Sequence, residues 1–367
     1  MAKAKYKQGK DGYWKTNVWD GTYLDTGKKR YVPLRSAKSS KDLENKVIAH
    51  NQAIKERTLV KPTDQTFYEY AMVWKSVYKV NREQNTRAMY NNIIEKHLKK
   101  IEKIRLADIA RVHYQYLINQ AEGHPRTQQQ IQIVFKQVIK SAIADQLLPG
   151  NTVSVIFDNV DKIKYVPGEK RALQEHEKKA VFAAEFSPRD RAFLYILYGC
   201  GLRRGEVLAL TRFNINLERS ILTVQHSICF DGNNPLLKGT KTENGVRNVP
   251  IPAKIKPALE EYIRTLRSEK LFPAKGGDWM TKSGYDKMWA RIIKRMQAVS
   301  EEQISGLTAH VFRHNYCSNL CYQIPTVSIK KIAELLGDTE KVVLDVYNHI
   351  ISEKEDAEKA VENALNF

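Results

Sequence analysis

Two short motifs near the C-terminal end of the chain could perform chemistry on a phosphate diester. Thr-Ala-His310-Val-Phe-Arg313-His places a histidine and an arginine three residues apart, and Tyr347 follows 34 residues after Arg313 in Leu-Asp-Val-Tyr-Asn-His. Residues three apart are neighbours on a helix, so both cationic groups can donate to non-bridging phosphate oxygens. A tyrosine hydroxyl can attack phosphorus and hold the cleaved strand covalently. The two motifs therefore predict phosphoryl transfer without a metal or another cofactor.

A second arginine motif lies upstream. Gly-Leu-Arg203-Arg204-Gly-Glu206 follows an apolar run from Ala192 to Leu202. A guanidinium stays charged at any relevant pH, and its paired N–H groups match phosphate oxygens. Arg203 is therefore the expected second phosphate-binding group, with Arg204 as the alternative. Glu206 lies three residues further along a predicted helix, where it either orients an arginine or a histidine or faces solvent.

A lysine supplies the expected proton donor. In Lys241-Thr-Glu-Asn244-Gly245-Val-Arg-Asn-Val-Pro, an Asn-Gly pair lies between two strand-like halves, which is the strongest short hairpin signal. We therefore expect Lys241 on a β-hairpin near its turn, from which it can give a proton to a leaving oxygen. Lys238, three residues earlier, is the competing choice.

The order Arg, Lys, His-x-x-Arg, Tyr resembles the tyrosine recombinase (phage integrase) family, over at least residues 170 to 350. The resemblance implies that Arg203, Lys241, His310, Arg313 and Tyr347 are catalytic, with His310 as a general acid/base or phosphate donor. It also implies a 3′-phosphotyrosine intermediate in a site-specific DNA recombinase that integrates or excises a phage or conjugative transposon. The alternatives are a type IB topoisomerase that relaxes DNA and a DNA-binding relative without catalysis.

One position departs from the family pattern. In most of the family a His, sometimes a Trp, follows Leu-Gly and donates to the phosphate, whereas this chain has Leu336-Gly337-Asp338. An ionised Asp donates nothing and repels a phosphate oxygen. Three accounts stay open: Asp338 faces away and another donor acts, the enzyme has one donor fewer, or Asp338 is protonated in a desolvated site. His349 is a candidate substitute donor, although the family carries a non-catalytic His at that place.

Charge predicts a polyanionic partner. The 367 residues carry a formal net charge of +19, with a pI near 9.5. Residues 1–60 alone hold 14 Lys and Arg against 6 Asp and Glu. The longest apolar run is too short for a membrane helix, and the first residues lack the apolar core of a signal peptide. Four cysteines show no metal-type pairing, so we expect reduced thiols in a cytoplasm and no metal site. The family resemblance implies a bacterial host and association with its nucleoid.

Residues 1–60 predict a small β-rich module. Strand-like stretches at Tyr13–Trp19, Thr22–Thr26 and Tyr31–Leu34 are separated by turn signals at Asp20-Gly21 and Gly27–Arg30. A helix capped by Ser39-Ser40 follows. Three strands and a helix resemble the arm-type DNA-binding domain of many integrases. The resemblance implies DNA contacts from five side chains: Trp14, Lys15, Lys28, Lys29 and Arg30.

The remainder predicts two further domains. Residues 61–165 contain four helical patterns, at about 66–78, 86–101, 106–119 and 126–147, and the first opens with a Thr66 to Glu69 capping box. This all-α bundle resembles the core-binding domain of the same family. Residues 166–367 predict a mainly α catalytic domain with a small antiparallel sheet. The expected fold class is therefore α+β and multidomain.

The family resemblance also implies partners. These are double-stranded DNA attachment sites and other copies of the chain, assembled as a homo-tetramer on DNA. An excisionase and a host DNA-bending protein are further candidate partners, and no membrane is involved.

Overall fold

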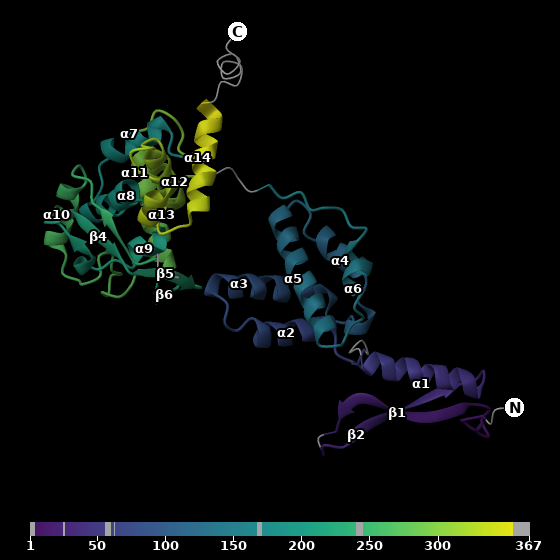
Figure 1. The fold of residues 1–367 in the computed structure, drawn as a ribbon. Coiled ribbons are helices and arrows are strands. Elements are labelled where there is room, and N and C mark those ends of the chain that lie inside the picture. Colours follow the sequence, from purple (N-terminus) through teal and green to yellow (C-terminus); the bar gives the residue numbers. More distant parts are fainter. Residues whose placement is uncertain are drawn as a thin grey trace, which may run out of the picture. The chain divides into compact units, whose positions relative to one another are not determined.

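The computed structural model describes residues 4–24, 26–55, 60–61, 63–166, 171–239 and 245–354. The chain forms two compact units, residues 1–167 and 168–367, and each is described by itself. Helices and small antiparallel sheets make up both units, which confirms the expected fold class (Figure 1). The division of the chain into three domains stays a prediction.

The first unit begins with a two-stranded sheet. Strands β1 (Trp14–Tyr23) and β2 (Lys29–Ser36) are antiparallel and lie against helix α1 (Ser40–Lys55). The expected third strand is wrong for the described residues, because β1 continues through Asp20-Gly21 instead of turning there. Trp19 pairs with Tyr31 and Tyr23 pairs with Lys29, so β1 holds two extra residues between these pairs as a bulge. Gly21, with φ of 87°, takes the conformation that this bulge requires.

A helical bundle completes the first unit. The capping box that opens α2 (Phe67–Tyr78) is confirmed: the Thr66 hydroxyl accepts from the Glu69 amide at 3.2 Å, and the Glu69 carboxylate accepts from the Thr66 amide at 2.8 Å. Helix α3 (Gln84–Asn92) continues as a π-helical turn, Ile93–His97, and a 3-10 turn, Leu98–Ile101. The buried core combines aromatic side chains from four helices with aliphatic side chains. The remaining elements are a 3-10 turn at Leu106–Asp108, α4 (Arg111–Asn119), α5 (Pro125–Ala144) and α6 (Thr152–Phe157).

The second unit is mainly helical, with two small antiparallel sheets. Strands β3, β4 and β7 form one sheet in the order β3-β4-β7, and β5 pairs with β6 in the other. The elements are α7 (Glu175–Ala183), α8 (Pro188–Cys200), α9 (Arg204–Leu208), a 3-10 turn at Arg212–Asn214, β3 (Ile215–Asn216), β4 (Ile221–Val224), β5 (His226–Asp231), β6 (Asn234–Gly239), β7 (Arg247–Pro250), α10 (Lys256–Thr265), α11 (Lys282–Gln297), α12 (Ala309–Cys321), α13 (Ile329–Leu336) and α14 (Glu340–Lys354).

The expected hairpin around Asn244-Gly245 is wrong for the strands that the structure describes. Strand β6 pairs with β5, and β7, after the Asn-Gly pair, pairs with β4 instead. Asp231 pairs with Asn234, so Gly232-Asn233 forms the two-residue turn between β5 and β6, and Gly232 has the left-handed φ of 57° that suits such a turn. Lys241 and Asn244 belong to residues 240–244, which lie outside the described residues.

The last three helices pack on one another. Val343, Val346 and Ile350 of α14 share a buried cluster with residues of α12 and α13, and Tyr347 packs partly buried against it. Cys317 and Cys321 of α12 belong to this cluster as free thiols, as does the buried Cys200 of α8 to the larger core. The end of α13 and the start of α14 are thereby fixed against α12. Within the part of the chain that the structure describes, no helix has both the length and the apolarity to cross a bilayer.

Candidate active site

A glycine turn positions Arg203. Helix α8 ends at Gly201, whose φ of 63° is left-handed, and a Cβ there would lie 2.3 Å from the Tyr316 ring. The turn leads into Arg203, the residue that caps the N-terminus of α9. The Arg203 amide donates to Glu206 Oε2 at 2.8 Å, and its guanidinium Nη1 donates to Glu206 Oε1 at 3.0 Å. Glu206 therefore orients Arg203 and does not face solvent.

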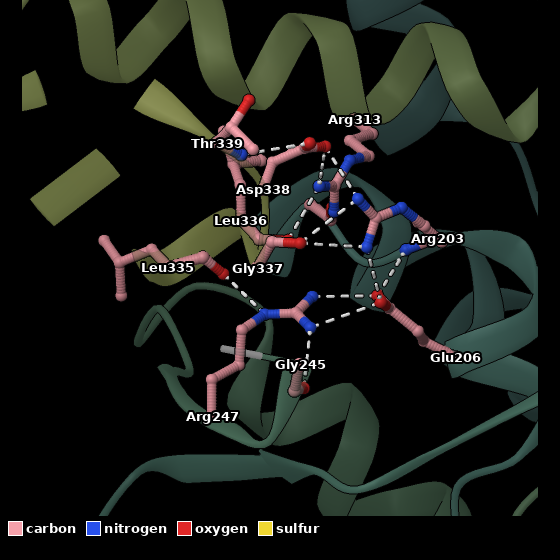
Figure 2. Close-up of polar contacts among 11 residues, drawn as sticks. Arg203, Glu206, Gly245, Arg247, Arg313, Leu335, Leu336, Gly337, Asp338 and Thr339 are labelled. Carbon is pink, nitrogen blue, oxygen red and sulfur yellow. Dashed lines mark hydrogen bonds and ion pairs between the residues drawn. The ribbon is translucent and has the colours of Figure 1, made fainter. Parts of the chain in front are cut away.

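Arg203 and Arg313 converge on one carboxylate oxygen (Figure 2). Arg203 Nη2 lies 2.6 Å from Asp338 Oδ2, and Arg313 Nη2 of α12 lies 3.0 Å from the same atom. The two arginines are more than a hundred positions apart in the chain, yet they bind the same single negative charge. The prediction that both could hold one phosphate is consistent with this geometry.

Arg247 is a third guanidinium of the site, and the sequence reasoning did not assign it a role. It donates to both carboxylate oxygens of Glu206, from Nη1 at 3.2 Å and from Nη2 at 2.8 Å. Only 5% of the Arg247 side chain and 4% of the Glu206 side chain are exposed. Along β7 the residues alternate buried and exposed, so Arg247 shares the inward face with Val249. The available sequence signal was an arginine two residues before a valine that faces the core from the same strand.

Three consecutive carbonyls at the end of α13 each accept from a different arginine (Figure 2). Arg247 Nε donates to Leu335 O at 2.8 Å, and Arg313 Nη2 donates to Leu336 O at 2.7 Å. Arg203 donates to Gly337 O from Nη1 at 3.1 Å and from Nη2 at 3.2 Å. The last carbonyls of a helix have no partners within the helix, and the helix dipole makes this end attractive to cations. The end of α13 thus gathers the three guanidinium groups.

Gly337 makes this arrangement possible. Its φ of 62° is left-handed, and a Cβ at this position would lie 2.6 Å from Arg247 Nη1. Both the backbone conformation and the space therefore require glycine. The Leu-Gly pair of the motif is explained by close packing of an arginine against the helix cap.

The charges of the site are balanced inside it. Burial on its own would raise the pKa of the Glu206 carboxyl, but Arg247 and Arg313 outweigh burial and hold that pKa below its usual range. Burial, together with the nearby Arg203, lowers the pKa of Arg313 to about 10, so Arg313 is still a cation at neutral pH. Both groups therefore stay charged while buried, as members of one ion-paired network.

The structure decides among the accounts of Asp338. Burial on its own would raise its pKa, but Arg203 and Arg313 outweigh burial and hold the pKa below its usual range. The carboxylate is therefore ionised, and it points at the two arginines. In this structure without DNA, Asp338 does not face away, because it binds two guanidinium groups, and these groups also favour its ionised form. The account in which the enzyme has one donor fewer stays open.

Three other predicted residues lie on α12 and α14. Tyr347 is half-buried on α14, and His310 is exposed in the first turn of α12. His349 is exposed on α14. Tyr347 lies on a helix that packs against both the helix of Arg313 and the helix whose end binds the arginines. The proposed catalytic roles of these side chains, and of Lys241, stay predictions.

The N-terminal sheet divides four of the five predicted DNA-binding residues between its two faces. Side chains alternate along a strand, and on β2 Tyr31 and Arg35 are exposed whereas Val32 and Leu34 are half-buried. Pairing places Lys15 opposite Arg35, and Lys29 lies over the Trp19 ring at 4.8 Å. The exposed face is defined here as Lys15, Trp19, Lys29, Tyr31 and Arg35.

Two of the five residues, Trp14 and Arg30, fall in the other phase, together with the buried Val18. Arg30 pairs with the buried Asp20 at 3.3 Å. Lys28 is exposed in the loop before β2. In the described ranges no three His, Cys, Asp or Glu side chains are grouped as a metal ion would require.

The sequence matches known families over most of its length. The profile of the phage integrase family matches residues 170–354, just over half of the chain. The profile of the SAM-like N-terminal domain of phage integrases matches residues 66–121. The XerC-like tyrosine recombinase of Caldanaerobacter subterraneus is 24% identical over 350 residues, covering 86% of this chain and 87% of the relative. The XerD tyrosine recombinase of Pseudomonas aeruginosa is 28% identical over 193 residues, which span 49% of this chain and 57% of the relative.

Solved structures share the fold. The Tn1549 transposon integrase in complex with a circular intermediate DNA has a TM-score of 0.65 and 18% identity, covering 77% of this chain and 95% of that one. A lambda integrase tetramer bound to a Holliday junction has a TM-score of 0.56 and 17% identity, covering 91% of each chain. With the family profile matched across the second unit, this chain belongs to the phage integrase family and is a tyrosine recombinase.

Proposed function

We propose that this tyrosine recombinase cleaves and rejoins DNA at defined attachment sites to integrate or excise a mobile element. The observation that carries the proposal is the convergence of Arg203 and Arg313 on one anionic oxygen. A non-bridging oxygen of a phosphodiester has the same charge and the same acceptor character as that carboxylate oxygen. The site therefore has the donors that a scissile phosphate needs.

In the proposed reaction the Tyr347 oxygen attacks phosphorus, and the bond from phosphorus to the 5′ oxygen breaks. His310 accepts the phenol proton, and Lys241 gives a proton to the departing 5′ oxygen. Arg203 and Arg313 stabilise the charge that develops on the non-bridging oxygens. The product is a 3′-phosphotyrosine and a free 5′-hydroxyl, so a second DNA strand can reverse the step through its own hydroxyl without an energy source.

The buried pair of Glu206 and Arg247 supports this reaction by holding Arg203. Glu206 binds the Arg203 amide and guanidinium, while Arg247 fixes Glu206 from the other side. Both are positioning residues. Preorganised donors of this kind cost no rearrangement at the moment of reaction.

The N-terminal module is proposed to bind DNA separately from the catalytic unit, as the arm-type domain of a three-domain enzyme with domains at 1–60, 61–165 and 166–367. Its exposed face combines basic and aromatic side chains on a two-stranded ribbon, and the DNA major groove admits such a ribbon. The formal charge of +19 supports a DNA partner. We further propose that the enzyme acts on the bacterial nucleoid in the cytoplasm.

The assembly on DNA is proposed to be a homo-tetramer. The lambda integrase with the same fold forms a tetramer on a Holliday junction, and the Tn1549 integrase binds a circular intermediate DNA. An excisionase and a host DNA-bending protein are proposed as accessory factors. The type IB topoisomerase alternative has less support, because the relatives matched along the chain are recombinases.

A covalent adduct on nicked DNA tests the proposal. Duplexes that carry candidate mobile-element ends, nicked near the expected cleavage point, trap the enzyme on DNA because the short 5′ fragment diffuses away. We expect a protein–DNA adduct on a denaturing gel with the unaltered chain and none with Tyr347→Phe. Tyr322→Phe, at an exposed tyrosine at the end of α12, serves as the matched control and keeps the adduct.

An adduct that persists in Tyr347→Phe removes the nucleophile assignment. Absence of an adduct from every element end, combined with intact DNA binding, would favour the non-catalytic alternative. Relaxation of supercoiled plasmids that lack such ends would favour the topoisomerase alternative.

A further inference from the structure

Asp338 occupies the place where the proposed function requires a phosphate oxygen. Its Oδ2 lies between Arg203 Nη2 at 2.6 Å and Arg313 Nη2 at 3.0 Å (Figure 2). Its Oδ1 accepts from the Thr339 amide at 3.1 Å. One carboxylate oxygen therefore fills the space between the two guanidinium groups, and the other is held by the backbone.

The two arginine nitrogens have no hydrogen left for a second anion while Asp338 is in place. Each Nη2 carries two hydrogens. Arg203 Nη2 donates to Gly337 O and Asp338, and Arg313 Nη2 donates to Leu336 O and Asp338. The two carbonyls belong to the end of α13, whereas the carboxylate can leave by rotation of one short side chain. A phosphate oxygen gains these hydrogens only when the carboxylate has left.

The exposure of the site allows that exchange. The Arg203 side chain is 41% exposed and that of Asp338 is 24% exposed, whereas that of Arg313 is 5% exposed. Solvent and DNA therefore reach the Arg203 side of the ion pair. Replacing a carboxylate by one phosphodiester leaves the number of negative charges between the arginines unchanged.

We propose that Asp338 is an internal anion that occupies the phosphate position in DNA-free protein and is displaced when DNA enters the site. The inference rests on the proposed phosphate-binding role of Arg203 and Arg313. Without DNA, the carboxylate holds the two guanidinium groups close together despite their like charges. With DNA, it competes with every phosphate, so the site accepts a phosphate only where other contacts help to displace the carboxylate.

Binding of a random-sequence duplex to the full chain tests the competition. Asp338→Asn keeps the size of the side chain and removes its charge, and Tyr347→Phe is added so that binding is measured without cleavage. We expect the Kd to fall by about tenfold, because an unfavourable like-charge contact is removed. Asp278→Asn makes the same charge change at a side chain that is 93% exposed and is expected to change the Kd by less than about twofold. Equal changes in the two variants would show a net-charge effect alone and overturn the inference.

A second measurement uses the unaltered chain and does not depend on how the variant folds. The carboxyl carbon of Asp338, observed by NMR with labelled aspartate, reports the pKa of that group. Free protein should show a pKa below the usual range, and saturation with the duplex should raise it to the usual range or above. A pKa that stays low in the complex means that Asp338 remains between the arginines, which overturns the inference.

The two proposals fail in different ways. Loss of the phosphotyrosine adduct in the nicked-duplex experiment would remove the proposed reaction but would leave both Asp338 measurements readable. If the Asp338 variant binds the duplex with an unchanged Kd while the unaltered chain forms the adduct normally, only the internal-anion role of Asp338 is removed.

Discussion

The two basic regions of this chain hold their charges in opposite ways. In the catalytic unit the side chains of Arg313 and Arg247 are only 5% exposed, and each donates to backbone carbonyls and to a carboxylate. On the N-terminal sheet the Lys15 side chain is 51% exposed, and Lys29 rests on an aromatic ring. Buried charges with fixed acceptors supply position, whereas exposed charges supply attraction that salt screens. The proposed reaction needs the first, and the proposed binding of DNA by the N-terminal sheet needs the second.

The largest effect expected from this comparison is on stability. Glu206→Gln leaves the buried Arg247 without its anion, so we expect the free energy of unfolding to fall by about 3–5 kcal/mol. The measurement is urea unfolding followed by fluorescence. As a control, Asp286→Asn breaks the exposed pair with Lys282 and should cost about 0.5 kcal/mol or less. A similar loss in the free energy of unfolding for the two variants would contradict the difference proposed between buried and exposed ion pairs.

The next effect is on catalysis. Arg313→Lys keeps a positive charge but loses the fork that reaches Leu336 O and the phosphate position, so adduct formation should slow by about 100- to 1,000-fold. Single-turnover adduct formation on the nicked duplex gives the rate. Arg295→Lys, an exposed position on α11, is the matched control and should leave the rate unchanged. A rate for Arg313→Lys within a few-fold of the unaltered chain would mean that charge alone suffices.

Acid is expected to have a smaller effect, by weakening the ion pairs of the buried arginine network. The pKa values of Glu206 and Asp338 lie below their usual range in the folded chain, so their stabilisation is present above the unfolded-state pKa and is lost as pH falls through the folded-state pKa. Below about pH 4 we expect stability to fall by about 1.4 kcal/mol per pH unit for each proton taken up. Melting temperature against pH measures this. Glu206→Gln should show a shallower acid slope, and an identical slope would place the titrating groups elsewhere.

The smallest effect is expected on the N-terminal sheet. Lys29→Ala removes one exposed cation, so the slope of log K against log salt for a random-sequence duplex should fall by about one. Adduct formation at saturating DNA should be unaffected. Lys41→Ala, an exposed lysine on α1, is the control and should keep the slope if the exposed sheet face is the contact. Equal loss from both variants would assign the binding to charge in general.

Local signals in the sequence predicted much of the fold. The capping box of Thr66 and Glu69 and the apolar spacing of α5 depend on neighbouring residues, and both predictions are confirmed. Turn signals whose outcome depends on distant strand pairing could not be resolved from the sequence. Asp20-Gly21 reads as a turn, but pairing with β2 across a bulge keeps the strand intact. Similarly, Gly232-Asn233 rather than Asn244-Gly245 closes the described hairpin, because strand partners are set by tertiary packing.

The site was predictable where chemistry restricts the residue type. Arg203, Arg313 and Glu206 carry distinctive donors and acceptors, and the structure brings all three into one network. The direction of Asp338 was not predictable from its type, since the same carboxylate repels a phosphate and attracts two guanidinium groups. The Arg247 role required knowledge of which strand face is buried, and that face is decided by the pairing of β7 with β4.

The helix end at Leu335 to Gly337 has a mechanical consequence. Its three carbonyls belong to successive peptide units at the end of one helix, so a shift of this helix end displaces the acceptors of all three arginines. Helix α14 begins at Glu340, three residues after Gly337, and carries Tyr347. The proposed nucleophile and the proposed phosphate-binding groups therefore share one structural support, and a displacement of α13 would shift both.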